Sequence, residues 1–151
     1  MARGEVVILM ADDDPDDVML VEKAFQEVEN GSLFRSVENG KELLEYLWRE
    51  GGFADPVVSP RPDLILLDLN MPLMNGKEAL MEIKSHETLR TIPIVMLTTS
   101  SEADNVSECY CLGASAYVVK PSGFTQLIQA VQSISSFWFR LNELPSALRK
   151  C

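Results

Sequence analysis

The chain has 151 residues, the usual size of one domain and enough to bury a core without disulfides or metals as staples. Its formal charge of −10 at pH 7 argues against nucleic-acid or anionic-membrane binding, because an acidic surface repels phosphates. We expect a cytoplasmic protein, because the chain has no apolar stretch of about 18 residues to span a membrane, no secretory signal at its start, and only three cysteines.

Short apolar runs predict the strands of a parallel sheet. Strands that helices cover on both faces are apolar throughout, whereas half-covered strands alternate. The strong runs are Val6–Ala11, Leu64–Leu69 and Pro93–Leu97, and the weaker ones are Leu33–Val37 and Ala116–Val119.

Apolar residues at helical spacing follow each of these runs. Asp14 and Pro15 are typical of a helix start, and Asn30-Gly31 of a helix end. Further helices are expected after Asn39, over Gly76–Ser85, from a Ser101 cap to Leu112, and from Phe124 onward; the Gly- and Pro-rich segment 51–62 is expected to be a loop. Regular alternation of strand and helix predicts one α/β domain, a doubly wound five-stranded parallel sheet with helices on both faces.

Polar residues stand where the strands end, and ligands of open parallel sheets bind beyond those carboxyl ends. Asp12 and Asp13 follow the first strand, Asp68 lies at the end of the third, Thr98 follows the fourth and Lys120 the fifth. Converging carboxylates repel one another unless a cation joins them, and oxygen ligands suit Mg²⁺. A lysine and a hydroxyl would help to stabilise a phosphoryl group. The pattern therefore predicts Mg²⁺-dependent phosphoryl transfer to Asp68, with Asp12 and Asp13 holding the metal.

Other polar residues in the sequence receive simpler interpretations. Asp14, Asp16 and Asp17 are interpreted as a capping cluster that complements the dipole of the first helix. His86, the only histidine, is interpreted as a surface loop residue. Its isolation argues against Ser-His-Asp and Cys-His catalysis and against an ordinary zinc site.

Four motifs together resemble the receiver domain of two-component response regulators. They are DDD after VVILMA, DLILLDLNMPLMNG, PIVMLTTS and YVVKP, and the resemblance covers roughly residues 6–136. It implies a flavodoxin-like (βα)₅ fold, a phosphoacceptor and a metal pair. By this resemblance the roles fall on Asp68 as phosphoacceptor, Asp12 and Asp13 as metal pair, the Asn70 main-chain carbonyl as metal ligand, Thr98 as switch hydroxyl, Tyr117 as aromatic switch and Lys120 as phosphate-contacting lysine, with a cis bond between Lys120 and Pro121.

A finer resemblance concerns the partner. The long segment before the third strand and the Phe137-Trp138-Phe139 run resemble the small stand-alone regulators that partner phytochrome histidine kinases. This implies a sensor histidine kinase, of phytochrome type, as the phosphoryl donor. We divide the chain into a receiver domain, 1–137, and a tail, 138–151, which is too short for an output domain. Output is then expected through protein contact or a downstream phosphotransfer protein.

The aromatic tail also predicts self-association. Consecutive aromatic residues point to different sides of a helix, so at least one of Phe137, Trp138 and Phe139 should face away from the domain. Exposed apolar patches usually mark interfaces, and symmetric pairs are the commonest assemblies. We therefore expect a homodimer built on the fourth helix, fifth strand and fifth helix, with these aromatic residues in or beside the contact.

The alternative function is a Mg²⁺-dependent phosphohydrolase that works through an aspartyl phosphate. Such hydrolases need a second acid two residues after the nucleophile, where this chain has Asn70, and a cap domain is missing. A flavodoxin-like flavin binder would need a phosphate-binding loop after the first strand, where this chain has the acidic run Asp12–Asp17. We therefore expect no enzyme, but a signalling protein that catalyses only its own phosphorylation and dephosphorylation.

Overall fold

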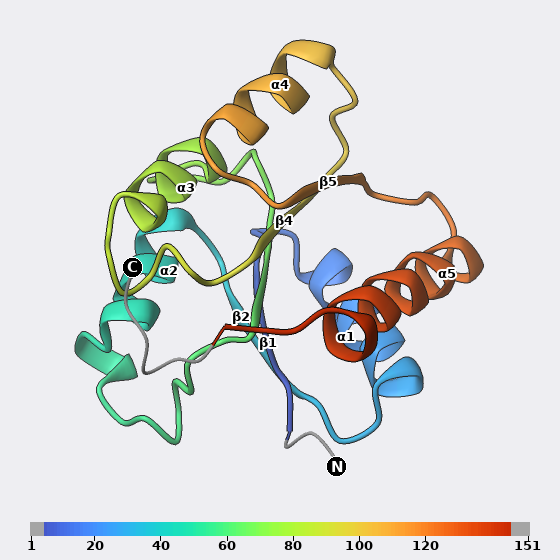
Figure 1. Cartoon of the computed structure of the whole chain (residues 1–151), viewed down its shortest axis with the longest axis horizontal. Coiled ribbons are helices and arrows are strands. Elements are labelled where there is room, and N and C mark those ends of the chain that lie inside the picture. Colours follow the sequence, from blue (N-terminus) through green and yellow to red (C-terminus); the bar gives the residue numbers. More distant parts are fainter. Residues whose placement is uncertain (1–4, 146–151) are drawn as a thin grey trace.

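The computed structural model describes residues 5–145, which form one parallel sheet with helices on both faces (Figure 1). The elements are β1 (Val7–Ala11), α1 (Pro15–Val28), β2 (Leu33–Val37), α2 (Gly40–Trp48), β3 (Leu64–Leu67), α3 (Gly76–Lys84), β4 (Ile94–Thr98), α4 (Ala103–Cys111), β5 (Ala116–Val119) and α5 (Phe124–Ser135). The strand order is β2-β1-β3-β4-β5, so β3 is the central strand. The predicted doubly wound, flavodoxin-like fold is confirmed.

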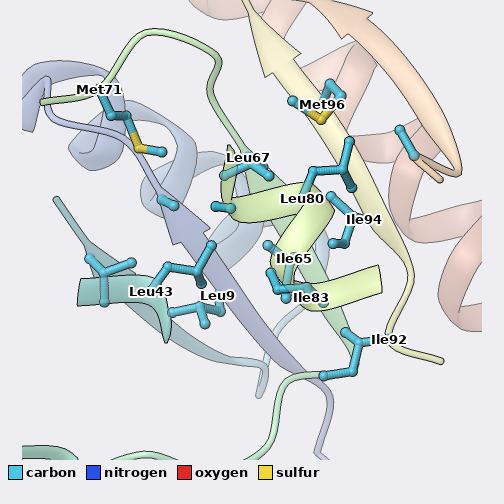
Figure 2. Packing of buried hydrophobic residues seen from close by; sticks show 14 of the residues in the cluster. Leu9, Leu43, Ile65, Leu67, Met71, Leu80, Ile83, Ile92, Ile94 and Met96 are labelled. Carbon is cyan, nitrogen blue, oxygen red and sulfur yellow. The ribbon is translucent and has the colours of Figure 1, made fainter. Parts of the chain in front are cut away.

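Successive residues of each inner strand belong to two different cores. Side chains alternate across a sheet, so a strand that is apolar at every position can pack on both faces. Leu9, Ile65 and Leu67 join the core under α2 and α3 (Figure 2), whereas Ile8 and Leu66 join the core under α1 and α5. This two-sided burial explains why β1, β3 and β4 are continuous apolar runs in the sequence.

The helix boundaries agree with the sequence at most positions. The Asp14 side chain caps α1 by accepting hydrogen bonds from the Asp16 and Asp17 amides, and Gly113 follows α4 with a φ of 107°. Ser101 was expected to cap α4, and this prediction is wrong, because Glu102 is the N-cap and makes no side-chain cap. The hydroxyl that accepts the Glu102 amide belongs to Ser100. None of the helices among residues 5–145 is long and apolar enough to cross a membrane.

Two segments outside the sheet are more ordered than the sequence indicates. The expected loop 51–62 contains a short 3₁₀ helix, Gly51–Phe53. After α5 the chain continues as a π-helical turn, Ser136–Leu141, tied to the end of α1 by a 2.9 Å ion pair between Arg140 and Glu29. The expected tail, 138–151, lies only partly within the described residues, since 146–151 fall outside them.

Candidate functional site

Three of the predicted site residues are fixed by backbone hydrogen bonds where the strands end. The Asp12 amide donates to the Val37 carbonyl at 3.0 Å, the Asp68 amide to Ala11 at 3.0 Å, and the Lys120 amide to Thr98 at 2.7 Å. Each bond extends the sheet pairing by one residue beyond a strand, so these side chains leave the same edge of the sheet. The sheet register therefore brings together residues that are far apart in the sequence.

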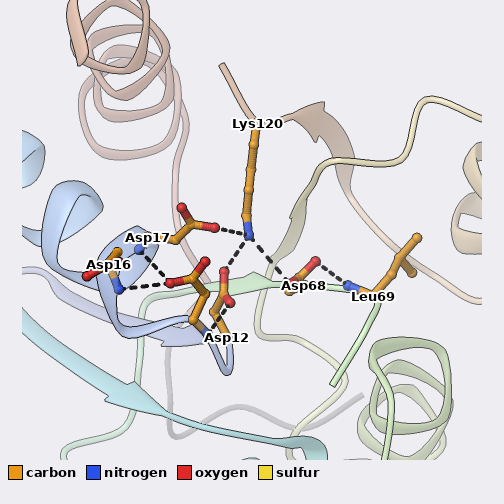
Figure 3. Close-up of polar contacts among 7 residues, drawn as sticks. Asp12, Asp16, Asp17, Asp68, Leu69 and Lys120 are labelled. Atoms are coloured by element: carbon orange, nitrogen blue, oxygen red, sulfur yellow. Dashed lines mark hydrogen bonds and ion pairs between the residues drawn. The ribbon is translucent and has the colours of Figure 1, made fainter. Parts of the chain in front are cut away.

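The Lys120 ammonium group is the centre of the site (Figure 3). Its Nζ lies 2.6 Å from Asp12 Oδ2, 2.7 Å from Asp17 Oδ2 and 3.4 Å from Asp68 Oδ2. The side chains of Lys120, Asp12 and Asp68 are 12%, 0% and 11% exposed, so water screens these charges poorly. One cation thus holds three carboxylates at the end of the sheet.

Burial and charge oppose each other at these groups. Burial raises the pKa of Asp12 above its ordinary value, although the hydrogen bonds from Lys120 and the Asp14 amide counteract part of that rise. Burial also acts to lower the pKa of Lys120, but its hydrogen bonds to Asp12 and Asp17 outweigh it, so the pKa of this lysine is raised. The lysine therefore stays charged, and its charge lowers the free-energy cost of burying the nearby carboxylates.

Asp17 stands in the acidic first turn of α1, as the sequence predicts, and its carboxylate has a further role in the site because it also contacts Lys120. Asp14 does act as the cap, and its carboxylate accepts the Asp16 amide at 2.9 Å. Asp17 stands in the first turn of α1, which begins at the sheet edge, so its carboxylate reaches Lys120. The sequence carries no local signal for this contact, because Asp17 and Lys120 are 103 positions apart.

Three carboxylates are close enough together to hold a metal ion. Asp12, Asp13 and Asp68 each offer an oxygen, and these oxygens lie within 4.8 Å of one another. Asp13 is exposed, and so is Asn70, two residues after Asp68. An all-oxygen donor set on an open edge fits Mg²⁺, which keeps several waters and takes few protein ligands.

Thr98 and Tyr117 lie beside this cluster, and their side chains are not hydrogen-bonded to each other. Thr98 Oγ1 is buried and has no hydrogen-bond partner among residues 5–145. The Tyr117 hydroxyl donates to the Ser100 carbonyl at 2.8 Å. An unpaired buried hydroxyl costs free energy, so Thr98 keeps an unsatisfied donor at the edge of the site.

The loop from β3 to α3 packs tightly against Asp68. The Leu69 amide donates to Asp68 Oδ1 at 2.8 Å, and the Gly76 amide donates to the Leu69 carbonyl at 2.8 Å. A Cβ added at Gly76 would collide with the Asp68 main-chain carbonyl. Glycine at this position therefore lets α3 begin directly against the Asp68 backbone.

Two further expectations concern the backbone and the aromatic run. The predicted cis bond between Lys120 and Pro121 is wrong, because no peptide bond among the described residues is cis; trans is the intrinsically preferred isomer by about 0.5–1 kcal/mol.

Phe137 is 47% exposed, which confirms that one aromatic residue faces away from the domain. Phe139 is 4% exposed and belongs to the core under α1 and α5, and Trp138 packs partly against that core.

Comparisons with known proteins agree with this geometry. A family model of the response regulator receiver domain matches residues 8–132. Response regulator Rcp1 of Synechocystis sp. is 37% identical over 141 residues, 93% of this chain and 94% of that protein. The structure of phosphorylated RcpA, a cyanobacterial phytochrome response regulator, superposes with a TM-score of 0.88 at 38% identity, covering 95% of this chain and all of that one. A Mn²⁺-bound structure of Rcp1 has a TM-score of 0.84 at 36% identity, covering 93% and 99% of the two chains.

Proposed function

Because the chain belongs to the response regulator receiver family, we propose that it accepts a phosphoryl group from a sensor histidine kinase on the Asp68 carboxylate. The observation that carries this proposal is the contact of Lys120 with both Asp68 and Asp12 at the carboxyl end of the sheet. Asp68 offers Oδ2 toward that cation, while Oδ1 is occupied by the Leu69 amide. A carboxylate held this way presents one oxygen to an incoming phosphorus atom.

The proposed step is a displacement at phosphorus. A carboxylate oxygen of Asp68 attacks the phosphorus of a phosphohistidine, the P–O bond forms as the P–N bond breaks, and the histidine nitrogen leaves with the electron pair. Lys120 stays protonated and supplies positive charge beside the transferred oxygens. Asp12 fixes Lys120 by the short 2.6 Å contact. Mg²⁺ held by Asp12, Asp13, Asp68 and the Asn70 carbonyl would add the further positive charge that a transferred phosphoryl group requires.

We infer that Thr98 and Tyr117 report the phosphorylated state. Thr98 Oγ1 has an unused donor, and a phosphoryl group brings strong acceptor oxygens to this edge. Movement of Thr98 toward such oxygens would empty the space beside Tyr117, whose ring could then leave the Ser100 carbonyl and turn inward. This change would alter the surface made by α4, β5 and α5.

The phosphohydrolase alternative is not favoured, and the chain is a response regulator receiver. Receivers are not enzymes in the usual sense. We propose that this one catalyses only its own phosphorylation and dephosphorylation, because the acceptor, the metal ligands and the lysine all belong to the same chain. Labelling by acetyl phosphate with Mg²⁺ and without any kinase tests that part of the proposal.

We propose a phytochrome-type histidine kinase as the donor and a homodimer as the working form. The full-length similarity to RcpA and to Rcp1 supports the choice of kinase. The side chains of Phe137 and Leu141 are 47% and 77% exposed, which supports an apolar contact surface next to α5. Output would then pass through protein contact or a downstream phosphotransfer protein, in the cytoplasm.

Substitution of the acceptor is the decisive experiment. Asp68→Asn should abolish labelling by a phosphohistidine kinase or by acetyl phosphate, because the amide oxygen is a poor nucleophile, while the circular dichroism spectrum stays unchanged. Asp16→Asn removes an exposed acid of the same edge and should be labelled at the normal rate. A hydroxylamine-sensitive phosphoryl adduct on Asp68→Asn, formed at the normal rate, would assign the acceptor to another residue.

A further inference from the structure

A cavity lies at the amino-terminal ends of the strands, opposite the carboxyl ends where Lys120 stands. It is found where α2 ends and where β3 and β4 begin. Its volume is about 350 Å³, within the range of small-molecule sites. Part of its wall is apolar, and none of the residues that line it is acidic; they are Tyr46, Leu47, Arg49, Ser59, Arg61, Pro62 and Leu89. It shares no residue with the phosphoryl-transfer site.

The two arginines are held in place but are not paired with acids. Arg61 Nη2 donates to the Thr88 carbonyl at 2.7 Å and to Thr91 Oγ1 at 3.3 Å, and Arg49 Nε donates to the Ser59 carbonyl at 3.3 Å. Each guanidinium has further donors beyond these bonds. Over the described residues 5–145, neither forms an ion pair. Two unpaired cations beside one cavity are unexpected in a chain with a charge of −10.

The electrostatics of the cavity favour an anion. Burial lowers the pKa of Arg61, and the nearby charge of Arg49 lowers it further, against a smaller opposing effect of Asp63. Arg61 is half-buried and Arg49 is exposed; their like charges repel each other, and an anion between them would remove that repulsion. The ring of Tyr46 forms part of the wall, and its hydroxyl is already used in a 2.7 Å hydrogen bond to the Pro60 carbonyl.

A simpler reading is that the arginines only fasten the loop 51–62. Arg49 does so through Ser59, and Arg35 does so through Val58 at 3.3 Å. Arg61 itself lies in that loop and fastens it to the segment before β4 through Thr88 and Thr91. Fastening the loop therefore occupies Nε of Arg49 and Nη2 of Arg61, but it does not use the remaining donors of the two guanidinium groups that line this cavity.

We propose that this cavity binds a small organic anion, a carboxylate or phosphate group on an apolar body, with the anionic oxygens between Arg49 and Arg61. Planar guanidinium groups match both oxyanions through paired N–H donors, while Leu47, Pro62 and Leu89 contact the apolar body. The proposal is independent of phosphoryl transfer, so binding should be the same in Asp68→Asn.

The test uses benzoate, phenyl phosphate and uncharged benzamide as probes of the full chain, with binding followed by NMR titration. At least one of the two anions should bind saturably, with shifts concentrated at the cavity, and benzamide should not. The comparison of benzoate with phenyl phosphate decides which oxyanion is preferred. Arg61→Gln and, separately, Arg49→Gln should weaken binding at least about tenfold. Arg90→Gln removes an exposed arginine outside the cavity lining and should leave the affinity unchanged.

Three outcomes would overturn the proposal. They are no saturation by either anion up to about 10 mM, equal binding of benzamide, and equal weakening in Arg90→Gln. Thermal unfolding of each variant verifies the fold. Arg49→Gln provides the measurement if Arg61→Gln does not fold, because Arg49 is exposed and its side chain donates a single hydrogen bond, to the Ser59 carbonyl.

Discussion

Lys120 Nζ lies closer to Asp17 Oδ2, at 2.7 Å, than to Asp68 Oδ2, at 3.4 Å. The lysine is therefore shared between the first turn of α1 and Asp68, the proposed acceptor. A phosphoryl group on Asp68 would compete with Asp17 for this ammonium group, so α1 is linked electrostatically to the state of the acceptor.

The first prediction compares Asp17→Asn with Asp16→Asn. Loss of the Asp17 charge removes a partner of a lysine that is only 12% exposed, and we expect the free energy of unfolding to fall by about 1 kcal/mol. Asp16 is exposed, and its variant should change stability by less than about 0.5 kcal/mol. Urea denaturation of both proteins measures the difference, and equal effects would mean that the Lys120–Asp17 contact adds no stability.

The second prediction concerns metal binding. Asp13→Ala removes an exposed carboxylate of the oxygen cluster, so Mg²⁺ affinity should fall at least about tenfold in calorimetric titration. Added Mg²⁺ should also raise the unfolding temperature of the wild type more than that of the variant. Asp16→Ala serves as the control and should titrate like the wild type. Unchanged affinity in Asp13→Ala would remove this residue from the metal site.

The third prediction concerns the unpaired Thr98 hydroxyl. Thr98→Val keeps the shape of the side chain and removes a buried donor without a partner, so the unphosphorylated protein should become more stable by about 1 kcal/mol. With Mg²⁺ and beryllofluoride as a phosphoryl mimic, the variant should gain less stability than the wild type. Thr99→Val, at an exposed position, is the matched control. A gain from the mimic as large as in the wild type would exclude a bond from Thr98 to the phosphoryl group.

Most residues of this site stand at the ends of strands, and the positions of those ends can be predicted from the sequence. Asp12, Asp68, Thr98 and Lys120 were predicted because buried strands are apolar runs, and the first polar residue after each run must lie at the sheet edge. Asp17 was missed because its role depends on where the first turn of α1 points. The apolar spacing of α1 indicates which face of the helix packs on the sheet, but it does not place Asp17 beside a lysine that is 103 positions away.

The orientation of the aromatic residues 137–139 is also only partly predictable from the sequence. The sequence predicts that one aromatic residue faces away, but it does not say which. In the structure the turn is π-helical, so the angular spacing of these residues differs from that of an α-helix, and Phe139 rather than Phe137 enters the core. The interface predicted for all three residues is therefore narrowed to a proposal for Phe137 and the neighbouring Leu141.

The fourth prediction tests self-association with this correction. Phe137→Ala combined with Leu141→Ala should shift sedimenting dimers toward monomers, with or without the phosphoryl mimic, while the free energy of unfolding changes little. Phe139→Ala should instead destabilise the fold by about 3–5 kcal/mol, because Phe139 is buried in its own domain. A wild type that remains monomeric at high micromolar concentration in both states contradicts the proposed dimer.

The fifth prediction concerns alkaline pH. Burial raises the pKa of Tyr46 to about 12, from an ordinary value of 10.0, against smaller lowering effects of Arg35 and Arg49. Between these pH values the unfolded chain loses the phenol proton and the folded chain keeps it, so stability falls as pH rises from about 10 to about 12. The wild type should lose about 2–3 kcal/mol more than Tyr46→Phe over this range. Tyr110→Phe, at an exposed position, should lose as much as the wild type.

The contact between Lys120 and Asp12 joins residues 108 positions apart. During synthesis Asp12 and Asp68 emerge from the ribosome long before β5, so a partly made chain holds the acids without their lysine. Pairings between such distant positions are slow to form, because the entropy of closing a long loop is lost before the contact repays it. The cluster around Lys120 is thus completed only when β5 has joined the sheet, and we expect a chain truncated before β5 to lack the lysine of the proposed phosphoryl-transfer site.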